Sequence, residues 1–409
     1  MRMSPKLAVQ SLLPRLAPLF ASARSHPTKQ CGSPVLLFSC LLVVAINTSN
    51  AIFPAYLCSG KMEGPMAQPD RQNNFNLIRL ILALCVILSH SPELTDGDNH
   101  REPLMCLFDT IPLGFAAVDA FFVLSGYLIV QSWDLAPSAK QFLRSRMLRI
   151  YPGFLVASVI SALLVGPLGA DAAAYFTAFD IGAFASGALL LQAPVVPPVF
   201  QGTPLPKVNL SMWTISYEFA CYLLVLAAGL TGALRIRHFW LAMTLAVLGA
   251  LALSKVVHFD VGLLRLPSFF LTGGCFYIYR DKIRLDGRVA IAVTAAVIVC
   301  MFSWSASELA LATGGCYALI YLAKKPSAFL NRFNALPDVS YGTYLYAWPI
   351  QKLLVWYFPG MSPWLVFAIA APAALALGAA SWFAIEKPAL KFKRPAAPAV
   401  PHEADRAAA

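Results

Sequence analysis

The feature that most restricts the fold of this chain is a series of long apolar runs separated by short polar loops. From Asn74 onward there are about ten such runs, many of them near the ~20 residues that an α-helix needs to cross a bilayer. Backbone polar groups inside lipid must be hydrogen-bonded within the segment, so we expect helices. The sequence therefore predicts an all-α fold, a polytopic membrane helix bundle with about ten core transmembrane helices. The expected spans are 75–91, 112–131, 151–169, 211–230, 239–254, 261–279, 289–304, 309–323, 338–358 and 364–385.

The runs also indicate how the chain is divided. Residues 74–388 are expected to form one membrane domain. Residues 1–70 fit three interpretations: an extra span, a signal-like segment, or text upstream of a later start codon. Residues 389–409 are rich in Pro and Ala and are expected to be a disordered tail. Within 170–210, the apolar centre at 181–193 is too short to span and is expected to be interfacial or re-entrant.

The charges are few and unevenly placed. Only 12% of the residues are charged, compared with about 25% in soluble domains, and the formal net charge is +11. Thirteen basic residues lie in four alternate loops and three lie in the opposite loops, so membrane topology explains the charge and no nucleic-acid partner is expected. The positive-inside rule then places both ends of the ten-span core in the cytoplasm. The basic loops are 132–150, 231–238, 280–288 and 324–334.

Cysteine spacing and short motifs give no sign of a bound group. The nine cysteines show no metal or disulfide spacing, and CxxC, HExxH, P-loop and GxSxG motifs are missing from the sequence. We therefore expect no bound metal and no nucleotide-binding fold.

Two polar residues in the first span are the strongest functional candidates. Arg79 and His90 are eleven residues apart, which places them on one helix face about 16 Å apart along the axis. An ionisable group in a span is costly unless it faces protein or water. Either residue alone could be an interfacial side chain, but the shared face indicates function.

Other spans carry further polar side chains. Asp119 lies near the outer end of the second span, where a carboxylate can orient a histidine. Trp213 and Glu218 lie in WTISYE of the fourth span, and Glu218 could partner His90 or bind sugar hydroxyls, with Trp213 as a stacking platform. The alternative for these residues is an interfacial or packing role.

Two more stretches combine polar and aromatic residues. Arg146 and Arg149 share one face of a basic helix start, and paired guanidinium groups suit phosphate, although plain positive-inside charge is the alternative. Tyr346 and Trp348 lie in a tyrosine-rich ninth span that Pro349 interrupts, either as substrate contacts or as packing. The Ser-Gly pair of the second span is expected to be a close helix-packing point rather than a nucleophile.

Taken together, these stretches resemble the acyltransferase-3 family, the integral-membrane acyltransferases of bacterial surface polysaccharides. The resemblance runs in family order over residues 74–388. The motifs that carry it are Arg79 and His90 with ten residues between them, FFVLSGYLI, RMLRIYP, WTISYE, SYGTYLYAWPI and the terminal EKP.

The resemblance implies the reaction and the roles. It implies transfer of an acyl group, usually acetyl from acetyl-CoA as co-substrate, to a sugar hydroxyl at the bacterial inner membrane. It implies that His90 is the essential base, that Arg79 is essential, and that Arg146 and Arg149 contact the CoA phosphates. Many members have a histidine before the Trp-Pro of the ninth span, where this chain has Ala347.

The sequence thus predicts a membrane O-acyltransferase with an acyl-CoA donor and a glycan or glycolipid acceptor. His90 takes a proton from the acceptor hydroxyl, and Asp119 or Glu218 orients His90. The alternative is a multi-span transporter or flippase of a glycolipid or small molecule, which predicts internal repeats that the sequence does not show. The sequence gives no indication of the acceptor's identity or of the oligomeric state.

Overall fold

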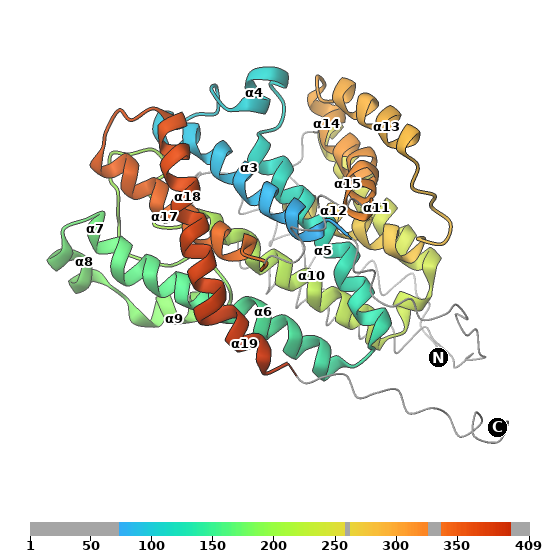
Figure 1. Cartoon of the computed structure of the whole chain (residues 1–409), viewed down its shortest axis with the longest axis horizontal. Coiled ribbons are helices and arrows are strands. Elements are labelled where there is room, and N and C mark those ends of the chain that lie inside the picture. Colours follow the sequence, from blue (N-terminus) through green and yellow to red (C-terminus); the bar gives the residue numbers. More distant parts are fainter. Residues whose placement is uncertain (1–72, 258–261, 326–336, 394–409) are drawn as a thin grey trace, which may run out of the picture.

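A computed structural model describes residues 73–257, 262–325 and 337–393, and the regular structure in these ranges is entirely helical (Figure 1). The expected extension at 1–70 lies outside the described residues, as does most of the expected tail, although α19 continues to Lys391. The helices are α3 (Phe75–Asp96), α4 (Pro103–Phe108), α5 (Leu113–Leu135), α6 (Ala139–Ile160), α7 (Gly166–Leu168), α8 (Ala172–Ala178), α9 (Ile181–Leu189), α10 (Trp213–Leu230), α11 (Arg237–Val257), α12 (Gly262–Ile278), α13 (Gly287–Cys300), α14 (Trp304–Ala310), α15 (Cys316–Lys324), α17 (Ser340–Tyr357), α18 (Pro363–Ser381) and α19 (Lys387–Lys391).

The described helices make this a multi-pass membrane protein. Seven helical segments in the described ranges are long and apolar enough to cross a bilayer, and α8 with α9, bent by 72°, adds an eighth if the pair is one span. All ten predicted runs fall on helices, but the structure does not show that all ten of these helices cross the membrane. The runs at 261–279 and 289–304 form α12 and α13, which are shorter than these segments. The run at 338–358 forms α17, which is less apolar than they are.

Helix α17 is polar because other parts of the protein surround it. Gln351 and Lys352 are fully buried. The Gln351 amide donates to the Ile87 carbonyl and to Ser91 Oγ, both at 2.8 Å, which joins α17 to α3. Lys352 Nζ donates to Thr203 Oγ1 at 2.7 Å and to the Pro204 carbonyl at 2.8 Å. A helix enclosed in this way does not need an apolar surface toward lipid.

Helices α5 and α12 are in backbone-to-backbone contact. A Cβ atom added to Gly126 would lie 1.9 Å from the Phe270 carbonyl oxygen, and one added to Gly273 would lie 2.1 Å from the Val123 carbonyl oxygen. This geometry confirms that the Ser-Gly pair marks a close packing point. At the C-terminal ends of the same two helices, the Tyr277 hydroxyl donates to Asp134 Oδ2 at 2.7 Å.

The loop predicted at 132–150 is mostly helix. Helix α6 begins at Ala139 and continues through Pro152, and π-helical turn η1 (Ser161–Val165) and α7 extend it. No Gly or Pro interrupts residues 139–151, so the basic segment joins the apolar run directly. Arg146 and Arg149 are therefore held on a regular helix. The expected interfacial or re-entrant piece at 181–193 corresponds to α9, which meets α8 at a sharp bend.

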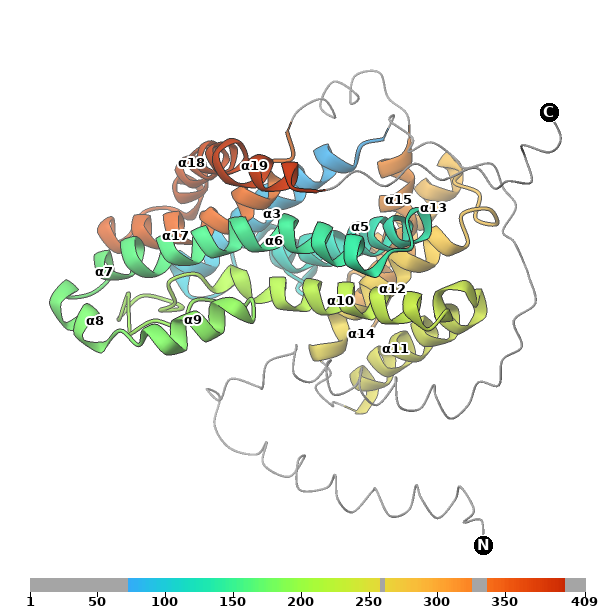
Figure 2. The same ribbon diagram turned by 90° about the horizontal axis from the view of Figure 1, so that it is seen from below.

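The central helices lie between two edges of the molecule. Figure 2 shows α17, α18 and α19 along one edge and α11 and α14 along the other, with α5, α6 and α10 between them. The ends that carry the basic loops contact one another: Arg280 lies 3.4 Å from Asp134, and Arg237 lies 2.9 Å from Asp281. We call this the basic side of the protein.

Candidate active site

A cavity of about 190 Å³ lies among α3, α5, α6, α10 and α17. Its polar lining includes one arginine from α3, two arginines from α6 and one glutamate from α10. Apolar side chains, mostly from α5, form much of the remaining wall. The charged lining residues are Arg79, Arg146, Arg149, Glu218 and Lys393.

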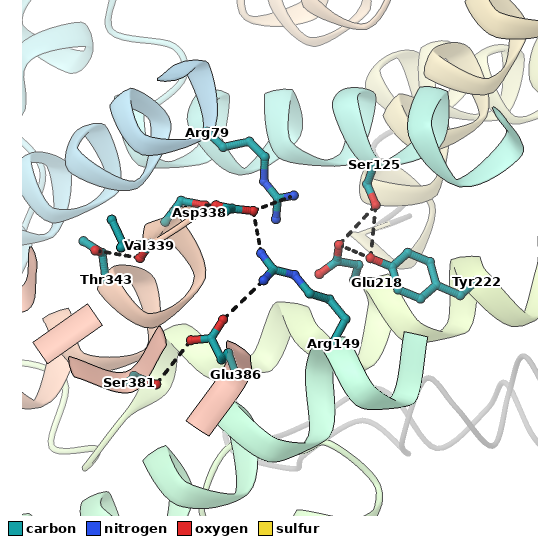
Figure 3. A network of polar contacts seen from close by, with 11 residues as sticks. Arg79, Ser125, Arg149, Glu218, Tyr222, Asp338, Val339, Thr343, Ser381 and Glu386 are labelled. Atoms are coloured by element: carbon teal, nitrogen blue, oxygen red, sulfur yellow. Dashed lines mark hydrogen bonds and ion pairs between the residues drawn. The ribbon is translucent and has the colours of Figure 1, made fainter. Parts of the chain in front are cut away.

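Two arginines of the cavity share one carboxylate (Figure 3). Arg79 Nη1 lies 3.4 Å from Asp338 Oδ2, and Arg149 Nη2 donates to the same oxygen at 2.5 Å. Arg149 also donates through Nη1 to Glu386 Oε2 at 3.3 Å. The four groups have no net charge when all are ionised, which is how buried charges are tolerated. Among the described residues, the buried Arg79 Nε atom has no hydrogen-bond partner, so Arg79 is incompletely satisfied.

A local irregularity aims Glu386 at this network. After α18 the chain forms the π-helical turn η5 (Trp382–Glu386), in which the hydrogen-bond spacing lengthens from four residues to five. Ser381 Oγ donates to Glu386 Oε1 at 3.2 Å across that spacing. Only 1% of Glu386 is exposed. Such turns re-orient side chains, and this one directs a carboxylate from the last span toward Arg149.

Glu218 is held by two hydroxyl groups. The Tyr222 hydroxyl donates to Glu218 Oε1 at 2.5 Å, and Ser125 Oγ donates to the same oxygen at 3.1 Å (Figure 3). Tyr222 lies one turn after Glu218 on α10, whereas Ser125 comes from α5. The carboxylate is therefore fixed from two helices.

Arg146 is less fully paired than Arg149. It donates to Ser132 Oγ at 3.0 Å, and its guanidinium lies 5.6 Å from the Phe142 ring and 5.9 Å from the Tyr222 ring. No ion pair to it is found among the described residues. Arg146 and Lys393 both line the basic side of the cavity, and partial burial and then the nearby Arg146 charge lower the pKa of Lys393.

His90 lies beyond the far end of the cavity. Its Nδ1 atom is 2.8 Å from Glu93 Oε2, and its ring meets the Trp348 ring edge-on at 4.9 Å between centroids. Tyr344 lines the cavity, and Trp348 is one turn further along α17. The structure thus places Glu93, rather than the expected Asp119 or Glu218, beside His90. Asp119 is paired with Arg265 instead, and Glu218 is hydrogen-bonded to Ser125 and Tyr222.

Asp119 belongs to a separate cluster of charges. Arg265 Nη2 donates to Asp119 Oδ2 at 2.8 Å, and Arg265 Nε lies 3.9 Å from Glu308 Oε1. Lys255 Nζ lies 2.9 Å from Glu308 Oε2. This cluster joins α5, α11, α12 and α14, so the position of Asp119 favours a structural role.

The aromatic candidates are divided between different surroundings. Trp213 is 37% exposed and stands edge-on to Tyr217, outside the cavity lining. Tyr346 is buried and also does not line the cavity, whereas Tyr341 and Tyr344 do. Trp348 contacts His90 and donates through Nε1 to the Lys207 carbonyl at 3.1 Å.

Four residues of these networks were missed from the sequence. Glu93 follows His90 by three positions, a spacing that brings two side chains together if the helix continues through Pro92, as it does. Tyr222 follows Glu218 by four positions and carries the same signal. Asp338 and Glu386 stand at the edges of spans, where a single acid carries no distinctive pattern. Within the described ranges, no group of three or more His, Cys, Asp or Glu side chains is arranged to hold a metal ion.

Comparison with known proteins agrees with this architecture. Residues 72–383 match the model of the acyltransferase-3 family, described as an acyltransferase domain. This chain belongs to that family. It is a membrane acyltransferase.

Two relatives match over most of their length. An O-acetyl transferase of Shigella phage Sf6 is 26% identical over 333 residues, which cover 78% of this chain and 96% of the phage protein. Nodulation protein 10 of Rhizobium leguminosarum bv. viciae is 26% identical over 363 residues, covering 79% and 94%. Acyltransferase MdmB of Streptomyces mycarofaciens is 30% identical over 146 residues, 36% of each chain. No solved structure matches this chain.

Proposed function

We propose that this acyltransferase moves an acetyl group from acetyl-CoA to a hydroxyl group of a surface or exported glycan. The observation that carries the proposal is one helix, α3, that presents Arg79 to a cationic cavity and His90 to the space beyond that cavity. The two residues are about 16 Å apart along the helix axis, comparable with the extended pantetheine arm of CoA. The donor can then be held on the basic side while its thioester reaches His90.

The pairing of the arginines supports different roles for them. Arg149 already has two carboxylate partners, so its charge stabilises the helix arrangement around Asp338 and Glu386. Arg146 and Lys393 have charge available for the phosphate groups of the donor at the basic side of the cavity. Guanidinium groups bind phosphate with charge-assisted hydrogen bonds. Arg79 lines the cavity and contacts one carboxylate among the described residues, so its terminal guanidinium N–H groups can bind the start of the pantetheine arm.

The histidine pair supports general-base chemistry. When Nδ1–H of His90 donates to Glu93, Nε2 is the unprotonated nitrogen and can accept a proton. The acceptor hydroxyl gives its proton to Nε2 and attacks the thioester carbonyl, and the CoA thiolate leaves. Edge-on contact with Trp348 holds the imidazole ring in place. Glu93 is thus a positioning residue for His90.

The membrane setting follows from the charge pattern. The basic side faces the cytoplasm, where acetyl-CoA is made, and His90 faces the opposite side of a bacterial inner membrane. The acceptor therefore approaches from the outer side, as expected for a glycan that is modified during or after export.

The proposal is tested by comparing His90→Gln with His100→Gln at equal membrane abundance. His100 is an exposed histidine of the outer segment and serves as the matched control. Acetate released from surface polysaccharide by mild alkali is measured in both strains and in a deletion strain. We expect loss of the ester in His90→Gln and in the deletion, and normal levels in His100→Gln. Normal ester levels in His90→Gln would refute the role of His90, and an unchanged deletion strain would remove surface glycans as acceptors.

A further inference from the structure

Glu218 lies near the level of Arg79 in the bundle. Helices α3 and α5 are antiparallel neighbours, and Gly114 of α5 packs on Ser89 of α3, where an added Cβ would lie 2.8 Å from Ser89 Oγ. Moving eleven residues along each helix from that contact brings Ser125 level with residue 78 of α3. Ser125 is hydrogen-bonded to Glu218. A donor that reaches from Arg146 to His90 must therefore pass Glu218.

One oxygen of Glu218 is satisfied and the other is available. Oε1 accepts both the Tyr222 and the Ser125 hydroxyls. Within the described part of the chain, Oε2 accepts no hydrogen bond, and it is not fully buried. Because Glu218 lines the cavity, Oε2 is left to accept hydrogen bonds from a molecule inside it.

The surroundings of Glu218 match the chemistry of a pantetheine arm. That arm carries two amide N–H groups and a hydroxyl group, all hydrogen-bond donors, between methyl and methylene groups. The cavity offers a fixed carboxylate oxygen as acceptor, with apolar walls that include Phe121, Leu128 and Ile215. Arg79, on the same cavity, offers donors for the carbonyl oxygens of the arm.

We propose that Glu218, held by Ser125 and Tyr222, is the subsite that binds the pantetheine arm of the acyl donor. The inference rests on the proposed acyl-CoA donor and assigns to Glu218 a binding role in place of the expected contact with His90. Tyr222 and Ser125 are positioning residues, because they direct Oε2 into the cavity. Loss of the Tyr222 hydroxyl leaves the carboxylate held only by the longer hydrogen bond from Ser125.

The test separates the arm of CoA from its nucleotide. Two probes are titrated by calorimetry into the purified full-length protein in nanodiscs: CoA, which carries the arm, and adenosine 3′,5′-bisphosphate, which lacks it. Tyr222→Phe and Glu218→Gln should each weaken CoA binding about tenfold, the size of a charge-assisted hydrogen bond, and leave the bisphosphate affinity unchanged. Arg146→Gln should weaken both probes.

Tyr175→Phe is the matched control. Tyr175 is also a buried tyrosine, and its hydroxyl donates to the Ala162 carbonyl at 2.6 Å in a cluster away from the cavity. The Tyr175→Phe protein should bind both probes with the affinities of the native protein. Unchanged CoA affinity in Tyr222→Phe, or equal weakening of both probes, would overturn the subsite while leaving the proposed function intact. A native protein that binds neither probe would instead overturn the proposed donor.

Discussion

At the scale of single residues, the proposed general base His90 is paired with Glu93. They lie one helical turn apart on α3 with 2.8 Å between Nδ1 and Oε2. A carboxylate at this position fixes both the orientation and the tautomer of the imidazole, which a general base requires. Replacing Glu93 by Gln keeps the shape but removes the charge. We expect kcat to fall about 10²-fold with little change in KM for the acyl donor, measured as acyl transfer by purified protein.

Asp119→Asn is the informative comparison for Glu93→Gln. Asp119 pairs with Arg265 and not with His90, so its loss should lower the thermal unfolding midpoint and leave the kcat of the remaining folded protein near normal. A kcat loss in Asp119→Asn at normal stability, together with a normal kcat in Glu93→Gln, would restore the original assignment of Asp119 as the partner of His90.

Prediction from sequence at the residue scale selected side chains that are unusual for their surroundings, and the roles given to them stay predictions. Arg79, Arg146, Arg149 and Glu218 are polar groups beside apolar runs, and the structure gathers them at one cavity. It failed where pairing depended on helix ends. Glu93 lies beyond the first expected span at 75–91, yet α3 continues to Asp96 before Gly97 ends it with a positive φ of 83°.

At the scale of the elements, the contact between α5 and α12 fixes the position of the helix that carries Ser125. Gly126 lies against the Phe270 backbone, while its neighbour Ser125 faces Glu218. An added methyl group cannot displace a backbone carbonyl without moving the helices apart. We therefore expect Gly126→Ala to destabilise the protein by about 2–3 kcal/mol, measured by unfolding in detergent. The same helix shift should weaken the hydrogen bond from Ser125 to Glu218.

Gly249→Ala is the matched control in a membrane helix. Within the described ranges, no atom outside the backbone of α11 itself lies within 4 Å of a Cβ added at Gly249, so alanine should be neutral or stabilise by about 0.5–1 kcal/mol. Equal stability of Gly126→Ala and Gly249→Ala would show that α5 and α12 are not in backbone contact.

The hydrophobic pattern predicted where the helices lie, but not where each helix ends or which helices are long and apolar enough to cross a membrane. The segment 132–150 was predicted as a basic loop with a helix start only around Arg146 and Arg149, whereas α6 already begins at Ala139, because nothing between there and Tyr151 breaks a helix. The predicted ninth span at 338–358 corresponds to α17, whose buried Gln351 and Lys352 contact other parts of the protein, and those contacts determine its composition. Tertiary partners of this kind are not visible in a single sequence.

For the whole molecule, the decisive property is its orientation. Thirteen basic residues lie in four alternate loops of the sequence. The structure joins three of those loops on one side of the protein through the ion pairs Arg280–Asp134 and Arg237–Asp281. Arg146 and Lys393 open toward that side, and His90 lies toward the other. If the basic side faced outward, cytoplasmic acetyl-CoA would have no route to Arg146, so the reaction scheme depends on the positive-inside orientation.

Cys106 provides a native probe of that orientation. It is an exposed free thiol in α4, on the side opposite the basic loops. In a background with serine at positions 31, 40, 58 and 300, a membrane-impermeant maleimide should label Cys106 in intact spheroplasts. Adding Cys106→Ser should abolish that labelling. Arg284→Cys in the same background places a thiol in an exposed basic loop, and it should react only after the membrane is permeabilised. The reverse pattern would place His90 in the cytoplasmic half and contradict acyl transfer to an exported glycan, because donor and acceptor would then meet on the wrong side.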